Sequence, residues 1–289
     1  MSQSAHIHPL LIQLTEHKNK AKEAFATKHQ QAHAWLKKRG LNIDELRMRS
    51  LKAMTGATLG SALVLASPQL GEVSKLPIVE RRIDLSVFLN ELFVLKKSPT
   101  SAEYEATIAM HIHKLYGISA VFELDQQRLP AYFGSMGLEQ HLIRYEGDQL
   151  SDHDVFLNTG MAPARGAFGY FAEPGKTSAQ MRVEEKYYIV LQTFLIPGWK
   201  SNWDSLKPWY KFRKFLVLNP DNGRAVVAVL GDSGPGQSTG KVFGGSPEVM
   251  AGLGIYPGKT KGDVLVLYLD DPGGKISLGE ALLPKESEL

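Results

Sequence analysis

From Ile118 onward the sequence alternates short β-branched and aromatic runs with glycine- and proline-rich turns, and this pattern limits the fold more than any other feature. The turns include Asn219-Pro220-Asp221-Asn222-Gly223. Many short strands with few helices between them favour a β-sandwich or a β-barrel. The expected strands are Ser119–Leu124, Ala131–Phe133, Ala167–Phe171, Tyr187–Leu195, Lys214–Leu218, Ala225–Leu230 and Asp263–Leu269.

Helical patterns occur mainly before this region. Residues 8–38 and 84–97 have apolar side chains at helical spacing, and 104–116 continues helically after a run of capping residues. Residues 246–253 have the pattern of one short helix that Ser246 caps. The sequence therefore predicts an α+β protein, with a helical N-terminal region followed by a β-sandwich or a β-barrel.

Composition excludes several classes of protein. The 289 residues contain no cysteine, which rules out disulfides, iron–sulfur clusters, thiolate zinc sites and cysteine nucleophiles. The net charge of +3 is too small to favour nucleic acid as a partner. All nine histidines precede residue 154, so a site in the later part uses a histidine from upstream or none. We expect no cofactor.

Residues 51–67, with the sequence LKAMTGATLGSALVLAS, follow a basic flank and contain one charge, Lys52. Pro68 ends the stretch, and the whole resembles an export signal with a long cytoplasmic leader. In this interpretation residues 1–50 are a basic helical leader inside the cell, 51–67 are a signal or membrane anchor, and the rest is extracytoplasmic. The apolar part is shorter than the ~20 residues that span a bilayer, so a buried helix of a soluble domain is the alternative.

An ordered series of motifs in residues 215–269 resembles the double-psi β-barrel of the rare lipoprotein A family. The Asp-Ser-Gly stretch is also similar to the aspartate loop of the three-Asp and murein transglycosylase A barrels. The motifs are Asn222-Gly223-Arg224, Val226-Val227, Asp232-Ser233-Gly234-Pro235, Gly240-Lys241, Ser246 to Leu253-Gly254, and Gly262 to Leu269.

The resemblance implies a six-stranded double-psi-like β-barrel after the helical N-terminal region. A weaker similarity in residues 129–150 implies that the barrel opens there and that residues 135–214 contain long insertions. The resulting domain boundaries are a helical segment at 75–117, the barrel at 118–271 and a tail at 272–289.

The resemblance implies an extracytoplasmic protein that binds peptidoglycan and cleaves its glycan strands as a lytic transglycosylase does. Because the 6-hydroxyl of the sugar is the nucleophile, one carboxyl group can serve as acid and then as base. Asp232, between a buried strand and a Gly-Pro loop, is the expected acid–base residue. The alternatives are that Asp232 only caps its loop or only contacts sugar, as in a non-catalytic wall-binding module. A cytoplasmic barrel that shares only the fold is the third interpretation.

This chain lacks the histidine that rare lipoprotein A enzymes carry before the Asn-Gly turn. Glu139 and His141 are one candidate pair of substitutes, and Asp152-His153-Asp154 is another candidate group. The run Asp152-His153-Asp154 has the composition of a metal site, but neighbouring side chains on a strand point to opposite faces. We therefore expect no metal there.

The densest aromatic run lies between residues 199 and 212, among several lysines. Aromatic faces stack on sugar rings and cations pair with the carboxylates of cell-wall glycan, although a buried aromatic cluster is the alternative. The segment GDSGPGQSTGK lacks the spacing of a phosphate loop, and no histidine follows Ser233 to make a serine hydrolase. The candidate substrate contacts are Trp199, Trp203, Trp209, Tyr210, Ser233 and Lys241.

Overall fold

The computed structural model describes residues 101–153 and 156–282, together with five single residues nearer the N-terminus. Those five are helical and exposed, as expected for one face of a helix within 8–38; they are Glu23, Thr27, Gln30, Ala34 and Lys37. The expected helix at 84–97 and the apolar stretch 51–67 lie outside the described residues. The chain divides into two units, residues 1–70 and 71–289.

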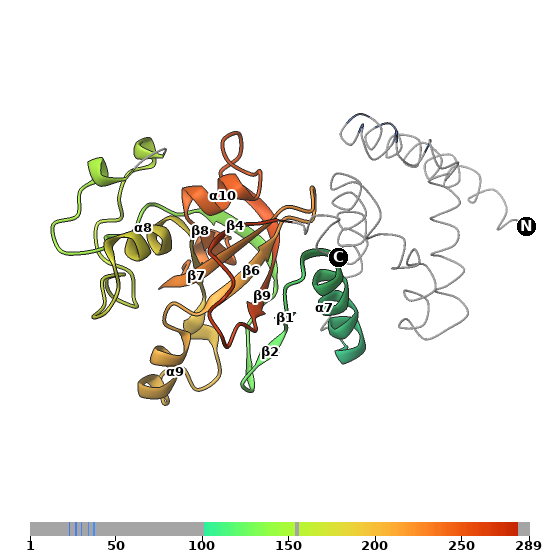
Figure 1. Cartoon of the computed structure of the whole chain (residues 1–289), viewed down its shortest axis with the longest axis horizontal. Coiled ribbons are helices and arrows are strands. Elements are labelled where there is room, and N and C mark those ends of the chain that lie inside the picture. The colour runs from blue at the N-terminus through green and yellow to red at the C-terminus, as the bar shows by residue number, and fades with distance from the viewer. Residues whose placement is uncertain are drawn as a thin grey trace, which may run out of the picture. The chain divides into compact units, whose positions relative to one another are not determined.

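Six strands of the second unit close into a β-barrel (Figure 1). Each strand of the ring is hydrogen-bonded to two neighbours, and the last returns to the first. In order around the ring they are β4 (Phe133–Leu138), β8 (Phe243–Gly245), β5 (Tyr188–Leu191), β7 (Ala225–Ser233), β6 (Lys214–Leu218) and β9 (Lys261–Leu269). The structure confirms the prediction of an α+β protein that contains a β-barrel.

The strand pairings repeat within the barrel. The pairs β4/β8 and β5/β7 are parallel, and the other four are antiparallel. Along the chain the six strands follow the order β4, β5, β6, β7, β8 and β9. If each strand is replaced by the one three places later in this order, with β4 following β9, every pairing becomes another pairing of the same direction, parallel or antiparallel. The first three strands and the last three are thus equivalent halves.

The strands β6, β7 and β9 provide most of the barrel core. Their central residues are buried on both faces, because loops and helices cover the outside. Such strands are continuous apolar runs rather than alternating ones, as Leu216, Val217 and Leu218 show at 0% exposure. The sequence predicted these three strands with the correct centres.

Shorter strands and helices surround the ring. Figure 1 shows α10 and α9 on opposite sides of the strands. The remaining elements are α7 (Ala102–Tyr116), α8 (Ser178–Lys186), α9 (Trp203–Tyr210), α10 (Pro247–Gly252), β1 (Ala120–Val121), β2 (Glu123–Leu124), β3 (Gln127–Arg128), β10 (Gly279–Ala281) and the 3-10 helices η1 (Leu150–Asp152), η2 (Leu157–Thr159), η3 (Thr193–Leu195) and η4 (Gln237–Thr239).

Capping residues set the ends of two helices as the sequence predicted. The Ser101 side chain accepts a hydrogen bond from the N–H of Tyr104 at the start of α7, and Gly117 ends the helix with φ of 68°. Ser246 caps α10, which has a proline in its first turn. The hydroxyl of Tyr116 donates to the carbonyl of Gly223, which ties α7 to the turn between β6 and β7.

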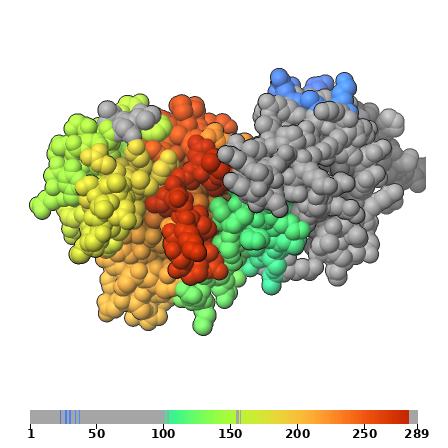
Figure 2. Space-filling view, viewed as in Figure 1, coloured from blue at the N-terminus to red at the C-terminus, as the bar shows by residue number. Residues whose placement is uncertain are grey.

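The insertions differ in part from the predictions. The first separates β4 from β5 and contains α8, and the second separates β5 from β6 and contains α9. Residues 167–171, expected as a strand, have no ladder partner because the rings of Phe168 and Phe171 pack inward instead, at 2% and 1% exposure. The 272–289 segment is not only a tail, since β10 pairs with β7. Figure 2 shows these last described residues, in red, running over the surface.

Within residues 101–153 and 156–282, no helix is both long and apolar enough to cross a bilayer.

Candidate functional site

Asp232 lies near the end of β7, opposite Val190 of β5 in their parallel ladder. Its Oδ1 atom accepts hydrogen bonds from the backbone N–H groups of Ala167, at 2.6 Å, and Ser233, at 2.7 Å. Among the described residues, its Oδ2 atom has no hydrogen-bond partner. One oxygen is therefore fixed in position and the other is available to a bound molecule.

The surroundings of Asp232 favour its protonated form. Burial raises the pKa of the Asp232 carboxyl above its ordinary value, and the hydrogen bonds from Ala167 and Ser233 offset only part of this effect. A carboxyl group that keeps its proton closer to neutral pH can act as a general acid. The alternative role of Asp232, capping of its loop, explains the hydrogen bonds of Oδ1 but gives Oδ2 no partner.

Glu139 follows β4 and covers the backbone of β8. Its Oε2 atom would be 2.9 Å from a Cβ atom placed on Gly244, so a side chain at Gly244 would displace the carboxylate. The Glu139 carboxylate makes no hydrogen bond or ion pair with any described residue. Burial raises the pKa of Glu139, Lys241 lowers it, and the negative charge of Asp232 raises it further.

The strand register brings these groups together. Gly137 of β4 pairs with Gly244 of β8, Gly244 pairs with Val190 of β5, and Val190 pairs with Asp232 of β7. Paired residues point to the same face of a sheet. Asp232 and Glu139 therefore lie toward the two ends of one row of paired residues, with Gly137, Gly244 and Val190 between them.

Two of the expected substrate contacts lie at this same edge. The Lys241 side chain extends over Gly137, where an added Cβ atom would be 2.9 Å from Nζ. The Ser233 hydroxyl is 2.5 Å from the Thr193 hydroxyl, and Gln192 donates from Nε2 to the carbonyl of Pro235 at 2.9 Å. These contacts hold the loop after β7 against β5.

The aromatic residues divide into buried and accessible ones. Trp199 and Tyr210 are 5% and 0% exposed, so they belong to the core rather than to an open binding surface. Trp203 is 40% exposed and packs edge-on against Trp199, with ring centres 5.4 Å apart. Trp199 in turn contacts Phe168. Phe168 follows Ala167, whose N–H donates to Asp232. This chain of contacts links the exposed ring of Trp203 to the carboxyl site.

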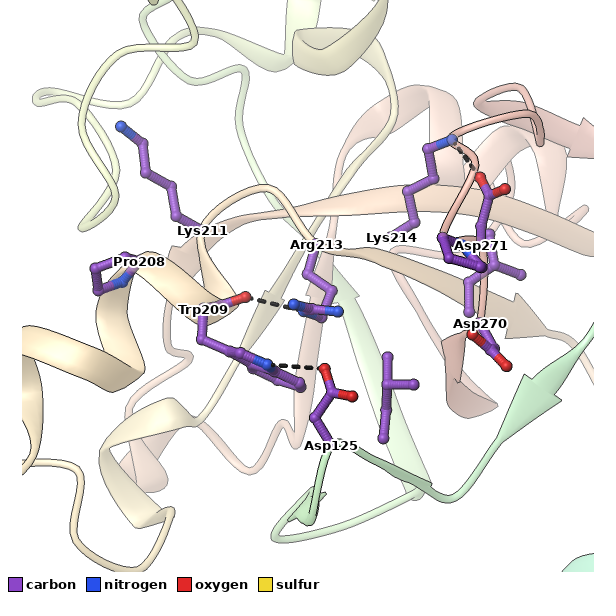
Figure 3. Close-up of a pocket in the computed structure, with 11 residues that line it drawn as sticks. Asp125, Pro208, Trp209, Lys211, Arg213, Lys214, Asp270 and Asp271 are labelled. Carbon is purple, nitrogen blue, oxygen red and sulfur yellow. Dashed lines mark hydrogen bonds and ion pairs between the residues drawn. The ribbon is translucent and has the colours of Figure 1, made fainter.

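Trp209 lines a separate pocket of about 420 Å³ (Figure 3). Its ring is covered by the Arg213 guanidinium, 3.7 Å from the ring centre, and its Nε1 donates to Asp125 at 3.1 Å. Lys214, at the other side, pairs with Asp271 at 2.8 Å. The cations of this pocket are thus already engaged by protein groups.

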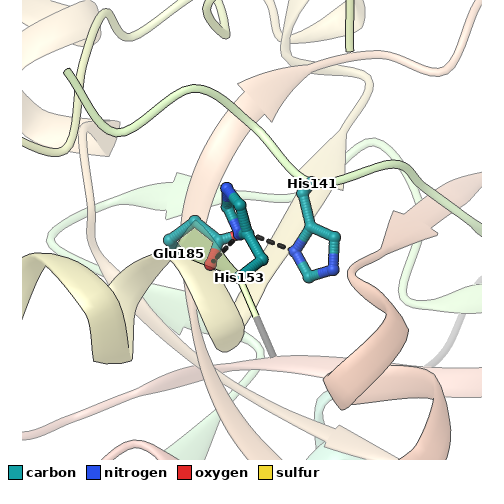
Figure 4. A group of neighbouring side chains, drawn as sticks. All are labelled: His141, His153 and Glu185. Atoms are coloured by element: carbon teal, nitrogen blue, oxygen red, sulfur yellow. Dashed lines mark hydrogen bonds and ion pairs between the residues drawn. The ribbon is translucent and has the colours of Figure 1, made fainter. Parts of the chain in front are cut away.

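His141 lies in the interior and not in an open cleft. It is 0% exposed, and its Nδ1 atom contacts Oε1 of Glu185. The Nδ1 atom of His153 lies 2.9 Å from the other oxygen of Glu185 (Figure 4). Although burial opposes ionisation of Glu185, the two histidines hold its pKa below the ordinary value.

A second layer of charged groups surrounds the histidines. Asp148 lies 3.4 Å from Nε2 of His153, and the guanidinium of Arg144 holds Asp148 through bonds of 3.1 and 2.9 Å. On the other side, Glu248 of α10 lies 3.9 Å from Nε2 of His141. Each imidazole therefore has carboxylates at both of its nitrogen atoms.

The run Asp152-His153-Asp154 does not act as a unit. The Asp152 side chain accepts hydrogen bonds from the N–H of Gln149 and the hydroxyl of Tyr145, both at 3.1 Å. Both partners belong to its own loop. Asp154 lies outside the described residues. Glu185 and Asp148, which do surround His153, were not found from the sequence, because no local pattern distinguishes them from other surface acids.

Tyr188 lies between the carboxyl pair, Asp232 and Glu139, and the buried histidine cluster. Its hydroxyl donates to the carbonyl of Gln140, and burial raises its pKa far above the ordinary value. The charges of four carboxylates raise this pKa further; they belong to Glu185, Glu139, Asp232 and Glu248. The open carboxyl pair and the buried histidine cluster are therefore neighbours around one ring.

No known protein-family model matches the chain, and no curated protein matches it. The fold and the site define a β-barrel with a partly buried carboxyl pair at one edge.

Proposed function

We propose that this barrel is of the double-psi type. Two equivalent halves related by a three-strand shift are expected for that topology, and the pairings here have this relation. The motifs that resemble the rare lipoprotein A family fall on β6 to β9: the Asn222-Gly223 turn joins β6 to β7, and Asp232 is the penultimate residue of β7.

We further propose that the protein cleaves the glycan strands of peptidoglycan, with Asp232 as the acid–base residue. The observation that carries this proposal is the state of the Asp232 carboxyl, which has one oxygen fixed by two backbone N–H groups, a second oxygen open to a ligand, and a raised pKa. A rigid carboxyl that retains its proton is what glycosidic cleavage requires.

In the lytic reaction Asp232 donates its proton to the glycosidic oxygen as the bond to the anomeric carbon breaks. The 6-hydroxyl of the same sugar then attacks that carbon, and the Asp232 carboxylate takes the hydroxyl proton. The products are a chain with a new free hydroxyl and a 1,6-anhydro sugar. The residue returns to its protonated form without a water molecule entering the reaction.

The position of Glu139 supports hydrolysis as a second candidate. Two carboxyl groups at one site are the usual equipment of hydrolytic glycosidases, in which one protonates the leaving group and the other activates water or attacks. The negative charge of Asp232 raises the pKa of Glu139, so the two carboxyl groups share one site. Hydrolysis would give reducing ends, whereas the lytic reaction gives anhydro ends.

Substrate binding in this proposal uses the accessible groups near the edge. The exposed ring of Trp203 can stack on a sugar, and Lys241 can pair with the lactyl or peptide carboxylates of the glycan. The side chains over Gly137 and Gly244 include those of Lys241 and Glu139, so a polymer that lies along this surface would meet a cation and a carboxyl group.

The test is digestion of purified peptidoglycan by the full-length protein, with the products identified by mass spectrometry. We expect anhydro-muropeptides from the wild type and none from Asp232→Asn. Asp263→Asn, which changes an exposed aspartate on β9, is the matched control and should cleave normally. Binding without any cleavage would instead identify a wall-binding module, and reducing products would identify a hydrolase.

The same proposal places residues 70–289 outside the cytoplasm, with 1–50 inside and 51–67 as a signal or membrane anchor. It is supported by the basic flank and the apolar composition of 51–67.

A further inference from the structure

We propose that His141, His153 and Glu185 bind one divalent transition-metal ion, with zinc as the best fit, and that this ion fastens the first insertion to the barrel. The three side chains offer ligand atoms that all lie within 4.8 Å of one another, and all three residues are buried. The proposal does not depend on glycan cleavage, because it concerns a different set of residues.

The ligand types favour zinc. Two imidazole nitrogens and one carboxylate are a common zinc ligand set, and they also accept cobalt and nickel. Magnesium and calcium prefer sites made only of oxygen atoms. The absence of cysteine from the chain leaves imidazole and carboxylate as its zinc ligands.

The orientation of His153 is the second and independent observation. Its side chain is 1% exposed, and oxygen atoms of Glu185 and Asp148 lie 2.9 and 3.4 Å from its two nitrogens. Even so, neither nitrogen makes a hydrogen bond of acceptable geometry with a described residue. A buried imidazole with oxygen atoms beside its nitrogens, but out of line with them, is expected where an ion between the groups organises them.

Both rings have the same arrangement around Glu185. Their Nδ1 atoms face the two oxygens of this carboxylate, while Nε2 of His153 faces Asp148 and Nε2 of His141 faces Glu248. Metal-bound histidines usually direct the other ring nitrogen at a carboxylate, which fixes the ring and raises its basicity. Asp148 is itself held by Arg144. The outer groups of a metal site are therefore present on both sides.

The ion would enter between the Nδ1 atoms and the Glu185 carboxylate, at about 2.0–2.2 Å from each ligand. It would displace the protons now shared by these groups, so that binding releases protons to solvent. The ligands move apart slightly as the ion enters, since His141 and Glu185 now lie at hydrogen-bonding distance.

The ligands come from three segments that have few other regular connections. His141 follows β4, His153 follows η1, and Glu185 lies in the last turn of α8. Among its described residues, the segment between β4 and α8 contains only 3-10 turns and a single bridge, His141 with Met161. An ion in a site this buried cannot reach a polymeric substrate, so its role is to stabilise the insertion.

The first measurement is the metal content of the untagged full-length protein, produced in zinc-supplemented medium, by inductively coupled plasma mass spectrometry. We expect one zinc per chain. Removal by dipicolinate should lower Tm by roughly 5 °C or more, with recovery on adding Zn²⁺ but not Mg²⁺. Cobalt should give the visible absorption of a low-coordinate nitrogen and oxygen site. A metal-free protein whose Tm does not respond to Zn²⁺ overturns the proposal.

Variants assign the ion to this cluster. His153→Gln should lose the zinc and the Tm response, whereas His113→Gln, on the exposed face of α7, should keep both. If His153→Gln does not fold, the cobalt spectrum of the wild type still decides between binding and no binding. The N-terminal histidines require their own control, in which zinc should be retained after all five are replaced by glutamine: His6, His8, His17, His29 and His33. Loss of the zinc in that control overturns the assignment.

Discussion

Glu139 follows the first strand of the barrel and Asp232 lies in the fourth, yet the charge of Asp232 raises the pKa of Glu139. In the ring of six strands, β8 and β5 lie between β4 and β7 on one side, and β9 and β6 lie between them on the other. Adjacent strands lie about 4.8 Å apart, so three intervals bring the two backbones within roughly 14 Å. The length of the Glu139 side chain over Gly244 closes much of that distance.

The first prediction concerns the stability of Asp232→Asn. The asparagine oxygen can still accept from Ala167 and Ser233, but the buried negative charge is gone. A raised pKa means that the folded state holds this proton more tightly than the unfolded state does. The stabilisation is therefore complete below about pH 4, the ordinary pKa of an aspartate, and is lost as pH rises through the folded-state value.

At pH 7 we therefore expect Asp232→Asn to have a higher free energy of unfolding than the wild type, and this gain should vanish near pH 4. Urea denaturation at several pH values measures it. A variant that is less stable than the wild type at pH 7 would show that the carboxylate is a structural loop cap. Asp263→Asn, at an exposed position of β9, is the matched control for the same substitution.

The second prediction concerns Gly244→Ala. The new methyl group would lie 2.9 Å from Glu139 Oε2 and 2.9 Å from Val190 Cβ, so the carboxylate must move. We expect cleavage to fall at least tenfold, with a stability cost of about 1–3 kcal/mol from overpacking. Gly236→Ala is the matched control, because nothing lies within 4 Å of an added Cβ there. Full activity in Gly244→Ala would exclude a role for the Glu139 position.

The third prediction separates the two neighbouring tryptophans. Trp203→Ala should reduce retention on insoluble peptidoglycan about three- to tenfold, while Tm changes little, because the ring is exposed. Trp199→Ala should instead lower the free energy of unfolding by about 3–5 kcal/mol, because the ring is buried. Unchanged retention in a folded Trp203→Ala protein would place the sugar-binding surface elsewhere.

The fourth prediction concerns topology. A reporter that works only after export should be active when it is fused after Leu289, and a reporter that works only in the cytoplasm should be inactive. The reason is that the basic flank of residues 51–67 is expected to stay inside the cell. Alkaline phosphatase and a cytoplasmic fluorescent reporter provide the two measurements. Activity confined to the cytoplasmic reporter would contradict the export proposal.

The barrel could be predicted in large part because its central strands are locally distinct. Residues 214–218 and 225–230 are apolar along their whole length, and the turn between them contains Asn222-Gly223. Strand β8 was missed, since two of its three residues are glycines, which carry no apolar pattern. Helix α8 was missed although Thr177 and Gln180 form a capping box, because it has no continuous apolar face.

The site could be predicted only where its residues lie close to a motif. Asp232, Ser233 and Lys241 belong to one glycine-rich segment, and the structure places them at one edge together with Glu139. The contacts of His141 could not be predicted, since its partner Glu185 is 44 residues away and its burial depends on how the insertion folds back.

The equivalence of the two barrel halves has a consequence for how such a protein can diversify. The ends of β4 and β7 correspond to each other under the three-strand shift, so the positions that carry Glu139 and Asp232 are set by closure of the ring and its backbone ladders. Loops that join the strands can lengthen or shorten without altering the spacing between these two positions. Related proteins could thus differ in the surfaces that bind a polymer while the two positions that carry the carboxyl groups keep the same spacing.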